Sequence, residues 1–339
     1  GQPEAGPPPA ALAAAHQAID DGVPGYWESD PLKEKIADQY SGTVDPSQVF
    51  LTCGASPALA MALGICFKPG DRIAAARPGY IAYRNVLRGL HLEPVEIGCD
   101  AATRFQLTAA QLEALPPAPN GVIISSPANP TGSVIPETEL RALVTLCQKR
   151  GIQIIADEIY HKLIYGEAPP SMALIDPGAM VVNSFSKYHC MPGWRLGWLL
   201  TPPDKVDAAT AYLGNFYLTA PSLSQKVGLA AMAETDTLDA NIEVYRQNRA
   251  LMLDACPSLG FGEVAPPDGA FYLYADISHL TDDSLAFCKR LLSETGVAAT
   301  PGVDFDPIDG HRFTRFSFAV STPTVEKALD RLAPWFSRQ

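Results

Sequence analysis

The sequence has no excess of positive charge. Its 339 residues include 25 Lys and Arg against 37 Asp and Glu, so the formal net charge is -12. No block of basic residues interrupts this acidic balance. Proteins bind polyanions mainly through clustered Lys and Arg, so the composition argues against nucleic acid as a partner. A bound phosphate would have to be a small one that is held by local donors.

Long hydrophobic runs and paired cysteines are also missing. No apolar run approaches the roughly 20 residues that a helix needs to cross a bilayer, and no signal peptide stands at the start. The seven cysteines are widely spaced, and none belongs to a C-x-x-C pair. This spacing argues against a disulfide framework or a zinc site. We therefore expect no membrane association, no metal and a cytoplasmic location.

Several familiar catalytic signatures are absent as well. There is no Walker P-loop, no H-E-x-x-H, no G-x-G-x-x-G after a strand and no G-x-S-x-G elbow. The six histidines are scattered singly, which is more typical of surface or core positions than of catalysis. Any chemistry must therefore come from a different set of residues.

The sequence does contain an alternation of short apolar runs and helical stretches from about Gln48 onward. The runs are "QVFLTC", "DRIAAA", "GVIISSP", "GIQIIADE" and "MVVNSFS", and a helix is expected over about 137–149. This pattern predicts βα units that stack into a mostly parallel sheet. In such sheets ligands bind beyond the carboxyl ends of the strands. The polar residues that follow these runs are therefore expected to share a site.

After about Pro221 the pattern changes to longer helical stretches and the runs "GAFYLYAD" and "RFTRFSFAVS". The last helix is expected to begin at Thr322 and to bury one apolar face. That face consists of Val325, Ala328, Leu329, Leu332, Trp335 and Phe336. We predict a large domain over residues 24–235 and a smaller α+β domain made of residues 1–23 and 236–339. The opening "GQPEAGPPPA" reads as the middle of a motif, so further residues are expected upstream.

The polar residues at the expected strand ends are of types that one cofactor uses together. They are Gly54, Ala55 and Ser56, Asn129 in "SPANPTG", Asp157 and Tyr160 in "ADEIY", and Ser184, Ser186, Lys187 and Arg195 in "NSFSKYHCMPGWRLG". Pyridoxal 5'-phosphate needs a lysine amine for its aldehyde and a carboxylate at its pyridine nitrogen. It also needs donors to its phenolic oxygen and its phosphate. The sequence offers a candidate for each.

The motifs "SPANPTG", "ADEIY", "SFSKYHCMPGWRLG" and "RFSFAVS" resemble those of the class I/II aminotransferases in order and approximate spacing. The resemblance covers nearly the whole chain. It implies a fold-type I enzyme dependent on pyridoxal phosphate, whose large domain has a mostly parallel seven-stranded sheet flanked by helices and whose smaller domain is α+β.

The resemblance assigns roles to residues around the whole cofactor. Lys187 matches the Schiff-base lysine, and Arg195, eight residues later, matches the arginine that binds the phosphate. Asp157 matches the aspartate that keeps the pyridine nitrogen protonated. Tyr160 and Asn129 match the two donors to the phenolic oxygen. A protonated ring is the stronger electron sink.

The resemblance also implies a phosphate site at the start of a helix. Ala55 and Ser56 match the turn whose backbone N–H groups meet the phosphate, since a helix amino end favours an anion. Ser184 and Ser186 are expected to add hydroxyl donors.

Three further residues match by position. Tyr80, in "RPGYIAY", lies where the family stacks an aromatic ring on the pyridine. Arg315, with Asn129, matches the group that takes the α-carboxylate of the substrate. Tyr26, in "GYWESDPLKEKIA", is the candidate for the tyrosine that reaches the phosphate of the neighbouring subunit. The segment is shorter than in the family and has Lys33 where the family has arginine. A shared site of this kind implies a homodimer.

The mechanism implied for Lys187 makes an energetic demand. Its amine must be neutral to take a proton from the substrate, although an ordinary lysine has a pKa of about 10.4. We expect desolvation and the nearby Arg195 to lower the pKa of Lys187 by roughly 3 units.

Several alternatives stay open at this point. Asp157 could cap a helix, Asn129 could belong to a simple turn, Tyr80 could be an ordinary half-buried aromatic residue, and Arg315 could be a surface cross-strand partner. The leading prediction is amino transfer between an L-amino acid and a 2-oxo acid. A carbon-sulfur β-lyase on the same fold and a non-catalytic ligand-sensing domain are the alternatives. No second arginine for a dicarboxylic side chain can be identified, so the donor and the acceptor stay open.

Overall fold

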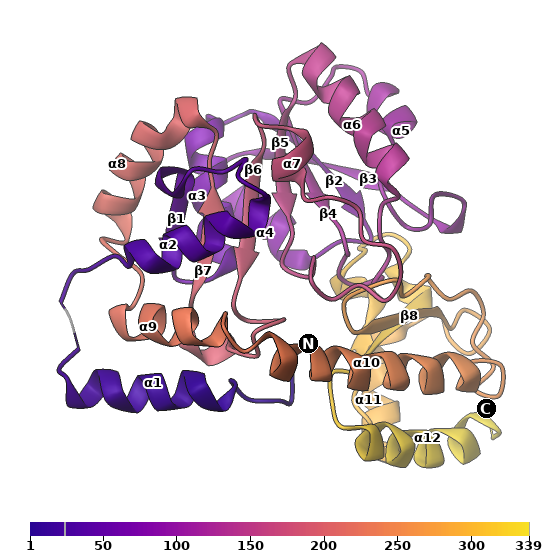
Figure 1. Cartoon of the computed structure of the whole chain (residues 1–339). Helices are drawn as coiled ribbons and strands as arrows, with labels where there is room; N and C mark the ends of the chain where they lie inside the picture. Colours follow the sequence, from indigo (N-terminus) through magenta and orange to yellow (C-terminus); the bar gives the residue numbers. More distant parts are fainter. Residues whose placement is uncertain (24, 339) are drawn as a thin grey trace.

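The computed structural model describes residues 1–23 and 25–338, and they form two units (Figure 1). The larger unit is built on a seven-stranded sheet with the order β1-β7-β6-β5-β4-β2-β3. Its strands are β1 (Val49–Thr52), β2 (Arg72–Arg77), β3 (Glu93–Gly98), β4 (Gly121–Ser125), β5 (Gln153–Asp157), β6 (Met180–Ser184) and β7 (Gly197–Leu200). Only β7 runs antiparallel to its neighbours, which confirms the mostly parallel seven-stranded sheet expected from the family resemblance.

Both faces of this sheet are buried, which explains why its central strands are continuous apolar runs. Alternate residues of β5 face opposite sides, so Ile154 packs in one core and Ile155 in the other. The covering helices are α2 (Asp30–Ala37), α3 (Ala55–Cys66), α4 (Ile81–Gly89), α5 (Ala109–Glu113), α6 (Glu137–Arg150), α7 (Met172–Ile175), α8 (Val206–Phe216) and α9 (Ser222–Ala231). Short 3-10 turns lie at Asp38–Tyr40, Pro46–Gln48, Ala101–Thr103, Pro192–Trp194, Pro203–Lys205, Gly302–Asp304 and Gly310–Arg312.

The smaller unit has an antiparallel sheet of three strands in the order β8-β10-β9. Its elements are α10 (Thr235–Ala255), β8 (Tyr272–Asp276), α11 (Ser284–Thr295), β9 (Thr300–Pro301), β10 (Phe313–Ser317) and α12 (Thr322–Phe336). The last helix begins at Thr322 as the sequence predicts. Val325, Leu332, Trp335 and Phe336 of its predicted apolar face are buried in the core of this unit.

Helix α1 (Pro9–Asp20) lies beside α9 (Figure 1). Its Ala11 and Ala15 are buried in the core of the larger unit. The chain before α1 reaches the smaller unit instead, since the backbone N–H of Glu4 donates to the carbonyl of Ala319 at 2.9 Å. We therefore propose domains at 24–235 and 236–339, with α1 placed on the larger domain rather than on the smaller one. Limited proteolysis should cut the connection between α9 and α10, residues 232–234, earlier in time than it cuts α9 itself. The reverse order would contradict this boundary.

The parallel register brings the ends of the central strands to one edge. Ser125 at the end of β4 is the partner of Asp157 at the end of β5, and Asp157 is in turn the partner of Val182 in β6. Side chains that follow these strands are therefore close together, as expected for an open α/β sheet. None of the helices within the described residues is long and apolar enough to cross a membrane.

The contact of β7 with its neighbours leaves no room for a side chain at Gly197. A Cβ atom there would lie 2.8 Å from the carbonyl oxygen of Asn183 and 2.8 Å from the carbonyl carbon of Gly54, and both are backbone atoms. We expect Gly197→Ala to lower the free energy of unfolding by about 1–3 kcal/mol, because backbone on both sides would have to move.

A matched control lies in α8. A Cβ atom at Gly214 would meet nothing within 4 Å, so Gly214→Ala should raise the free energy of unfolding by about 0.5–1 kcal/mol. Urea unfolding of both variants measures the difference. Equal midpoints for the two variants would show that the strand contact at Gly197 is not tight.

Candidate active site

One cavity, with a volume of about 430 Å³, collects most of the residues that the sequence singles out. It lies where the carboxyl ends of β4 and β5 face residues of the smaller unit. The predicted residues that line it are Ala55, Ser56, Tyr80, Asn129, Asp157, Tyr160, Ser186, Lys187, Arg195 and Arg315. Ser184 and Tyr26 are not among the lining residues.

Lys187 follows β6 and extends its amine into the cavity. Its Nζ donates a hydrogen bond to the carbonyl oxygen of Gly1 at 2.6 Å and lies 5.7 Å from the centre of the Tyr160 ring. Burial, followed by the positive charge of Arg315, lowers the pKa of Lys187 to about 8 against the opposing influence of Asp157, and Arg195 contributes less. The direction is the one expected from the sequence, but Arg315 rather than Arg195 is the more important cation.

Asp157 ends β5 and is buried. Its carboxylate accepts a hydrogen bond from the hydroxyl of Tyr83 at 2.5 Å and another from the backbone N–H of Ile159 at 3.2 Å. Burial raises the pKa of Asp157, while these two donors act in the opposite direction. A turn and not a helix follows Asp157, so the alternative role as a helix cap does not apply.

Arg315 lies in β10 and reaches across to the larger unit. Its Nη1 donates to Oδ1 of Asn129 at 2.7 Å, and its Nη2 donates to Oγ1 of Thr300 at 3.1 Å. The buried Nε has no hydrogen-bond partner within the described part of the chain. Only 8% of Arg315 is exposed, which excludes the alternative role as a surface residue. A guanidinium held in this way has donor capacity left for a carboxylate.

The start of α3 can receive an anion. Gly54 precedes the helix, and no side chain caps its free N–H groups. Arg195 lies against this turn, where its Nη2 donates to the carbonyl of Cys53 at 3.2 Å and its Nη1 to that of Pro192 at 2.9 Å. Gly54 has a φ of +104°, and a Cβ atom there would lie 2.6 Å from Nη2 of Arg195. Glycine at this position therefore permits both the turn and the close approach of the guanidinium.

The two predicted serines have different places. Ser186 lines the cavity, whereas the buried Oγ of Ser184 lies 3.0 Å from Oγ of Ser186 and 3.1 Å from the carbonyl oxygen of Leu196. It also accepts a hydrogen bond from the backbone N–H of Ser186 at 3.1 Å. Ser184 therefore holds Ser186 and does not itself face the cavity.

The two remaining tyrosines differ in exposure. Tyr80 is at the edge of the cavity and is 37% exposed, with its ring in an edge-to-face contact with Tyr83. Tyr26 is 84% exposed. The cavity of this chain does not bring Tyr26 together with the other candidates, so its role towards a second subunit stays a prediction.

Sequence reasoning missed Tyr83, Tyr272 and Thr300, which also line or support the cavity. Tyr83 stands only three residues after the predicted Tyr80, but its side chain points to Asp157, 74 residues further along the chain. Tyr272 belongs to the apolar run "GAFYLYAD", in which it looks like an ordinary core residue. No local pattern distinguishes either tyrosine from the core.

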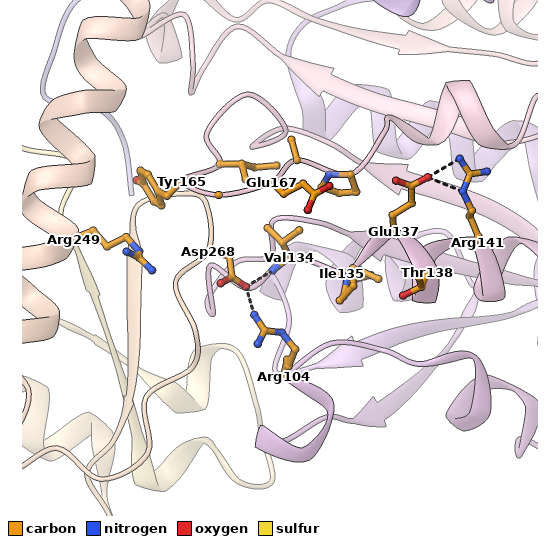
Figure 2. Close-up of a pocket in the computed structure, with 15 residues that line it drawn as sticks. Arg104, Val134, Ile135, Glu137, Thr138, Arg141, Tyr165, Glu167, Arg249 and Asp268 are labelled. Carbon is orange, nitrogen blue, oxygen red and sulfur yellow. Dashed lines mark hydrogen bonds and ion pairs between the residues drawn. The ribbon is translucent and has the colours of Figure 1, made fainter.

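A larger cavity, of about 790 Å³, lies elsewhere and contains none of the predicted residues. Figure 2 shows its charged side chains. Arg104 pairs with Asp268 at 2.6 Å, and Arg141 pairs with Glu137 at 2.7 Å. These four charges are paired with one another, whereas Arg249 donates to the carbonyl of Pro267 and no lysine lines the cavity. We therefore place the site in the smaller cavity. Within the described residues no group of three or more His, Cys, Asp or Glu side chains could hold a metal ion.

Comparison with known proteins decides the family. Residues 1–332 match the family described as aminotransferase class I and II. The chain belongs to this family. A relative named valine–pyruvate aminotransferase, from Mycobacterium tuberculosis, is 45% identical, and the alignment covers 100% of this chain and 90% of the relative. A probable N-acetyl-LL-diaminopimelate aminotransferase from Bacillus subtilis is 32% identical over 98% of this chain and 86% of its own length.

Solved structures agree. The crystal structure of an aminotransferase from Mycobacterium tuberculosis has a TM-score of 0.96 and 45% sequence identity, and it covers 100% of this chain and 90% of that one. The chain is thus an aminotransferase with the fold-type I architecture, which confirms the activity and the fold class predicted from the sequence. The β-lyase and ligand-sensing alternatives are not favoured.

The lowered pKa of Lys187 in this aminotransferase can be measured directly. In protein freed of small ligands, the rate at which an amine-reactive reagent acylates Lys187 should reach half of its maximum near pH 8. Arg315→Gln should move this midpoint upward, because the variant removes the second cause of the shift. Peptide mass spectrometry over a pH series measures the rate, with exposed Lys149 as the internal reference. A midpoint near 10.4, the ordinary value for lysine, would contradict the effect of burial.

Proposed function

We propose that this aminotransferase uses pyridoxal 5'-phosphate, held in the 430 Å³ cavity, to move an amino group between an L-amino acid and a 2-oxo acid. The observation that carries the proposal is that Lys187, Asp157 and Arg315 face one cavity, although Lys187 follows β6, Asp157 ends β5 and Arg315 lies within β10 of the other sheet. An amine, a carboxylate and a guanidinium are the three groups that this cofactor and an amino-acid substrate need together.

The donors of the cavity suit each end of the cofactor. The uncapped start of α3, the hydroxyls of Ser56 and Ser186, and Arg195 would hold the phosphate. The buried carboxylate of Asp157 would pair with the pyridine nitrogen. Asp157 keeps two hydrogen-bond donors that favour its ionised form, so a protonated nitrogen would complete its set of partners. Tyr160 and Asn129 would donate to the phenolic oxygen, and Tyr80 would cover the ring.

The unpaired Nε of Arg315 fits the other end of the site. Its position in the cavity, together with its bonds to Asn129 and Thr300, leaves the guanidinium fixed and only partly satisfied. A substrate α-carboxylate would supply the missing acceptors. Two parallel N–H···O bonds would then orient the α-carbon towards Lys187.

When bound, the cofactor withdraws electrons from the α-carbon and so makes its proton acidic. The neutral Nζ of Lys187 would take that proton from the α-carbon and would return it to a carbon of the cofactor. With a pKa of about 8, a useful fraction of this amine is neutral near pH 7, and its conjugate acid is still acidic enough to give the proton back. Burial of the amine thus serves the reaction directly.

The name of the relative from Mycobacterium tuberculosis supports valine and pyruvate as the first substrates to test. The cavity is consistent with substrates that carry one carboxylate. Its lining cations are Lys187, Arg195 and Arg315, and each already has a proposed role. Within the described residues, none is left for the second carboxylate of aspartate or glutamate.

We also propose a homodimer in which Tyr26 reaches the phosphate site of the neighbouring subunit. Large apolar side chains are exposed, as expected for an interface: Tyr26 is 84%, Phe216 69% and Leu218 53% exposed. Sedimentation at the mass of one chain, with 36.2 kDa per chain, would contradict the dimer. The acidic composition and unpaired cysteines support a location in the cytoplasm, which cell fractionation can test.

The decisive experiment for the function is an acceptor-dependence assay. Purified protein with pyridoxal phosphate should convert valine to its 2-oxo acid continuously only when a second 2-oxo acid such as pyruvate is present, and alanine should form in equal amount. A screen of other amino acids and 2-oxo acids then ranks the substrates. A β-lyase would instead release pyruvate and ammonia from a cysteine conjugate without any acceptor.

Removal of the amine tests the central assignment. We expect Lys187→Ala to retain cofactor reversibly but to lower kcat by at least about 10³-fold, because both the covalent anchor and the proton acceptor are lost. Mass spectrometry after borohydride reduction should show cofactor fixed to the parent protein and not to the variant. Lys149→Ala, a change on the exposed side of α6, is the control and should keep full activity. Undiminished turnover by Lys187→Ala would overthrow the assignment.

A further inference from the structure

Tyr272 has a place in the cavity that the proposed roles do not explain. It lies in β8 of the smaller unit, is 1% exposed and lines the cavity. Its hydroxyl oxygen is 2.7 Å from that of Tyr160, which follows β5 of the larger unit. Tyr272 of the smaller unit is thus hydrogen-bonded to Tyr160 of the larger unit. Tyr160 is the residue that would donate to the phenolic oxygen of the cofactor.

The same tyrosine also contacts the arginine that would hold the substrate. The Cζ atom of Arg315 lies 4.3 Å from the centre of the Tyr272 ring, on its face. Tyr272 is therefore in contact with Arg315 on one side and with Tyr160 at its hydroxyl. It is the physical link between the proposed carboxylate site and the proposed phenolic-oxygen site.

Each of the two hydroxyls has one proton to donate, so the direction of their hydrogen bond matters. The guanidinium against its ring makes Tyr272 the better donor. Burial raises the pKa of Tyr272, but Arg315 acts to lower it. Burial and then Tyr272 itself hold the pKa of Tyr160 well above its usual range. When Tyr272 donates, the oxygen of Tyr160 accepts, and the proton of Tyr160 is free to point into the cavity.

We infer that Tyr272 is a positioning residue that turns the hydroxyl proton of Tyr160 towards the cofactor and couples it to Arg315. The inference rests on the proposed function, because it assumes that Tyr160 donates to the phenolic oxygen of pyridoxal phosphate. Tyr272 itself need not touch the reacting atoms. Its hydroxyl orients Tyr160, and its ring supports Arg315.

Other groups around Tyr160 have to be separated from this effect. Lys187 lies over its ring at 5.7 Å, and Arg315 and Asp157 also act on its hydroxyl electrostatically. The ring of Phe271, in an edge-to-face contact, carries no charge. A variant that keeps all of these groups and the shape of the ring is therefore required.

Tyr272→Phe meets this requirement, since it removes only the hydroxyl. A hydrogen bond donated to the phenolic oxygen stabilises the deprotonated form of the bound cofactor, so its weakening should shift the pH midpoint of the cofactor absorbance upward by a few tenths of a unit. We expect kcat to fall about 3- to 10-fold. The KM for the amino acid should stay within about twofold, because the ring remains against Arg315.

Tyr274→Phe is the matched control. Tyr274 is in the same strand, is 0% exposed, and its buried hydroxyl has no hydrogen-bond partner within the described residues. This variant should leave the absorbance midpoint, kcat and KM unchanged. Tyr272→Leu, which also removes the ring, should raise KM by about tenfold in addition to the effects of Tyr272→Phe.

A double variant makes the test strict. If Tyr272 acts through Tyr160, Tyr160→Phe combined with Tyr272→Phe should have the same absorbance midpoint and kcat as Tyr160→Phe alone. Additive changes would overturn the inference, as would an unchanged midpoint in Tyr272→Phe. Failure of the proposed function looks different, because the parent protein would then show no cofactor absorbance that responds to amino acids.

Discussion

The site depends on one constraint: the amine of Lys187 is largely buried and lies close to the guanidinium of Arg315. Burial and Arg315 hold its pKa at about 8, below the ordinary 10.5. Because the folded value is lower than the unfolded one, this group destabilises the fold by on the order of 3 kcal/mol below pH 8, and the cost declines as the pH rises towards 10.5. The two cores of the larger unit must offset that cost. The same constraint gives the amine its chemistry.

The site is divided between the two units, and this division follows from where the strands end. The larger unit supplies Asn129 and Tyr160 at the edge of a parallel sheet, and the smaller unit supplies Arg315 and Tyr272 from an antiparallel one. Hydrogen bonds of 2.7 Å join Arg315 to Asn129 and Tyr160 to Tyr272. A group that binds Arg315 would therefore be in contact with residues that are hydrogen-bonded to both units.

The sequence predicted those parts of the fold and the site that follow from local patterns. The five apolar runs became strands. Asp157 is near the end of the run "GIQIIADE" and Lys187 directly follows "MVVNSFS", so both were expected at strand ends, and their roles were taken from the family resemblance. The strands β3 and β7 were not predicted from apolar runs, since β3 is a partly exposed edge strand and β7 begins at Gly197, inside the motif "SFSKYHCMPGWRLG". Tyr83 and Tyr272 were missed because their hydroxyls find partners 74 and 112 residues away, a relation that only the folded chain creates.

The surroundings of Asp157 and Lys187 show how burial shifts the pKa values of two groups in one cavity in opposite directions. Burial disfavours the charged form of both, so it raises the pKa of the carboxyl and lowers that of the amine. For Asp157 the donors from Tyr83 and Ile159 work against burial and favour the carboxylate. For Lys187 the cation of Arg315 adds to burial and favours the neutral amine. Hydrogen-bond donors therefore oppose the effect of burial on the pKa of Asp157, whereas a like charge adds to the effect of burial on the pKa of Lys187.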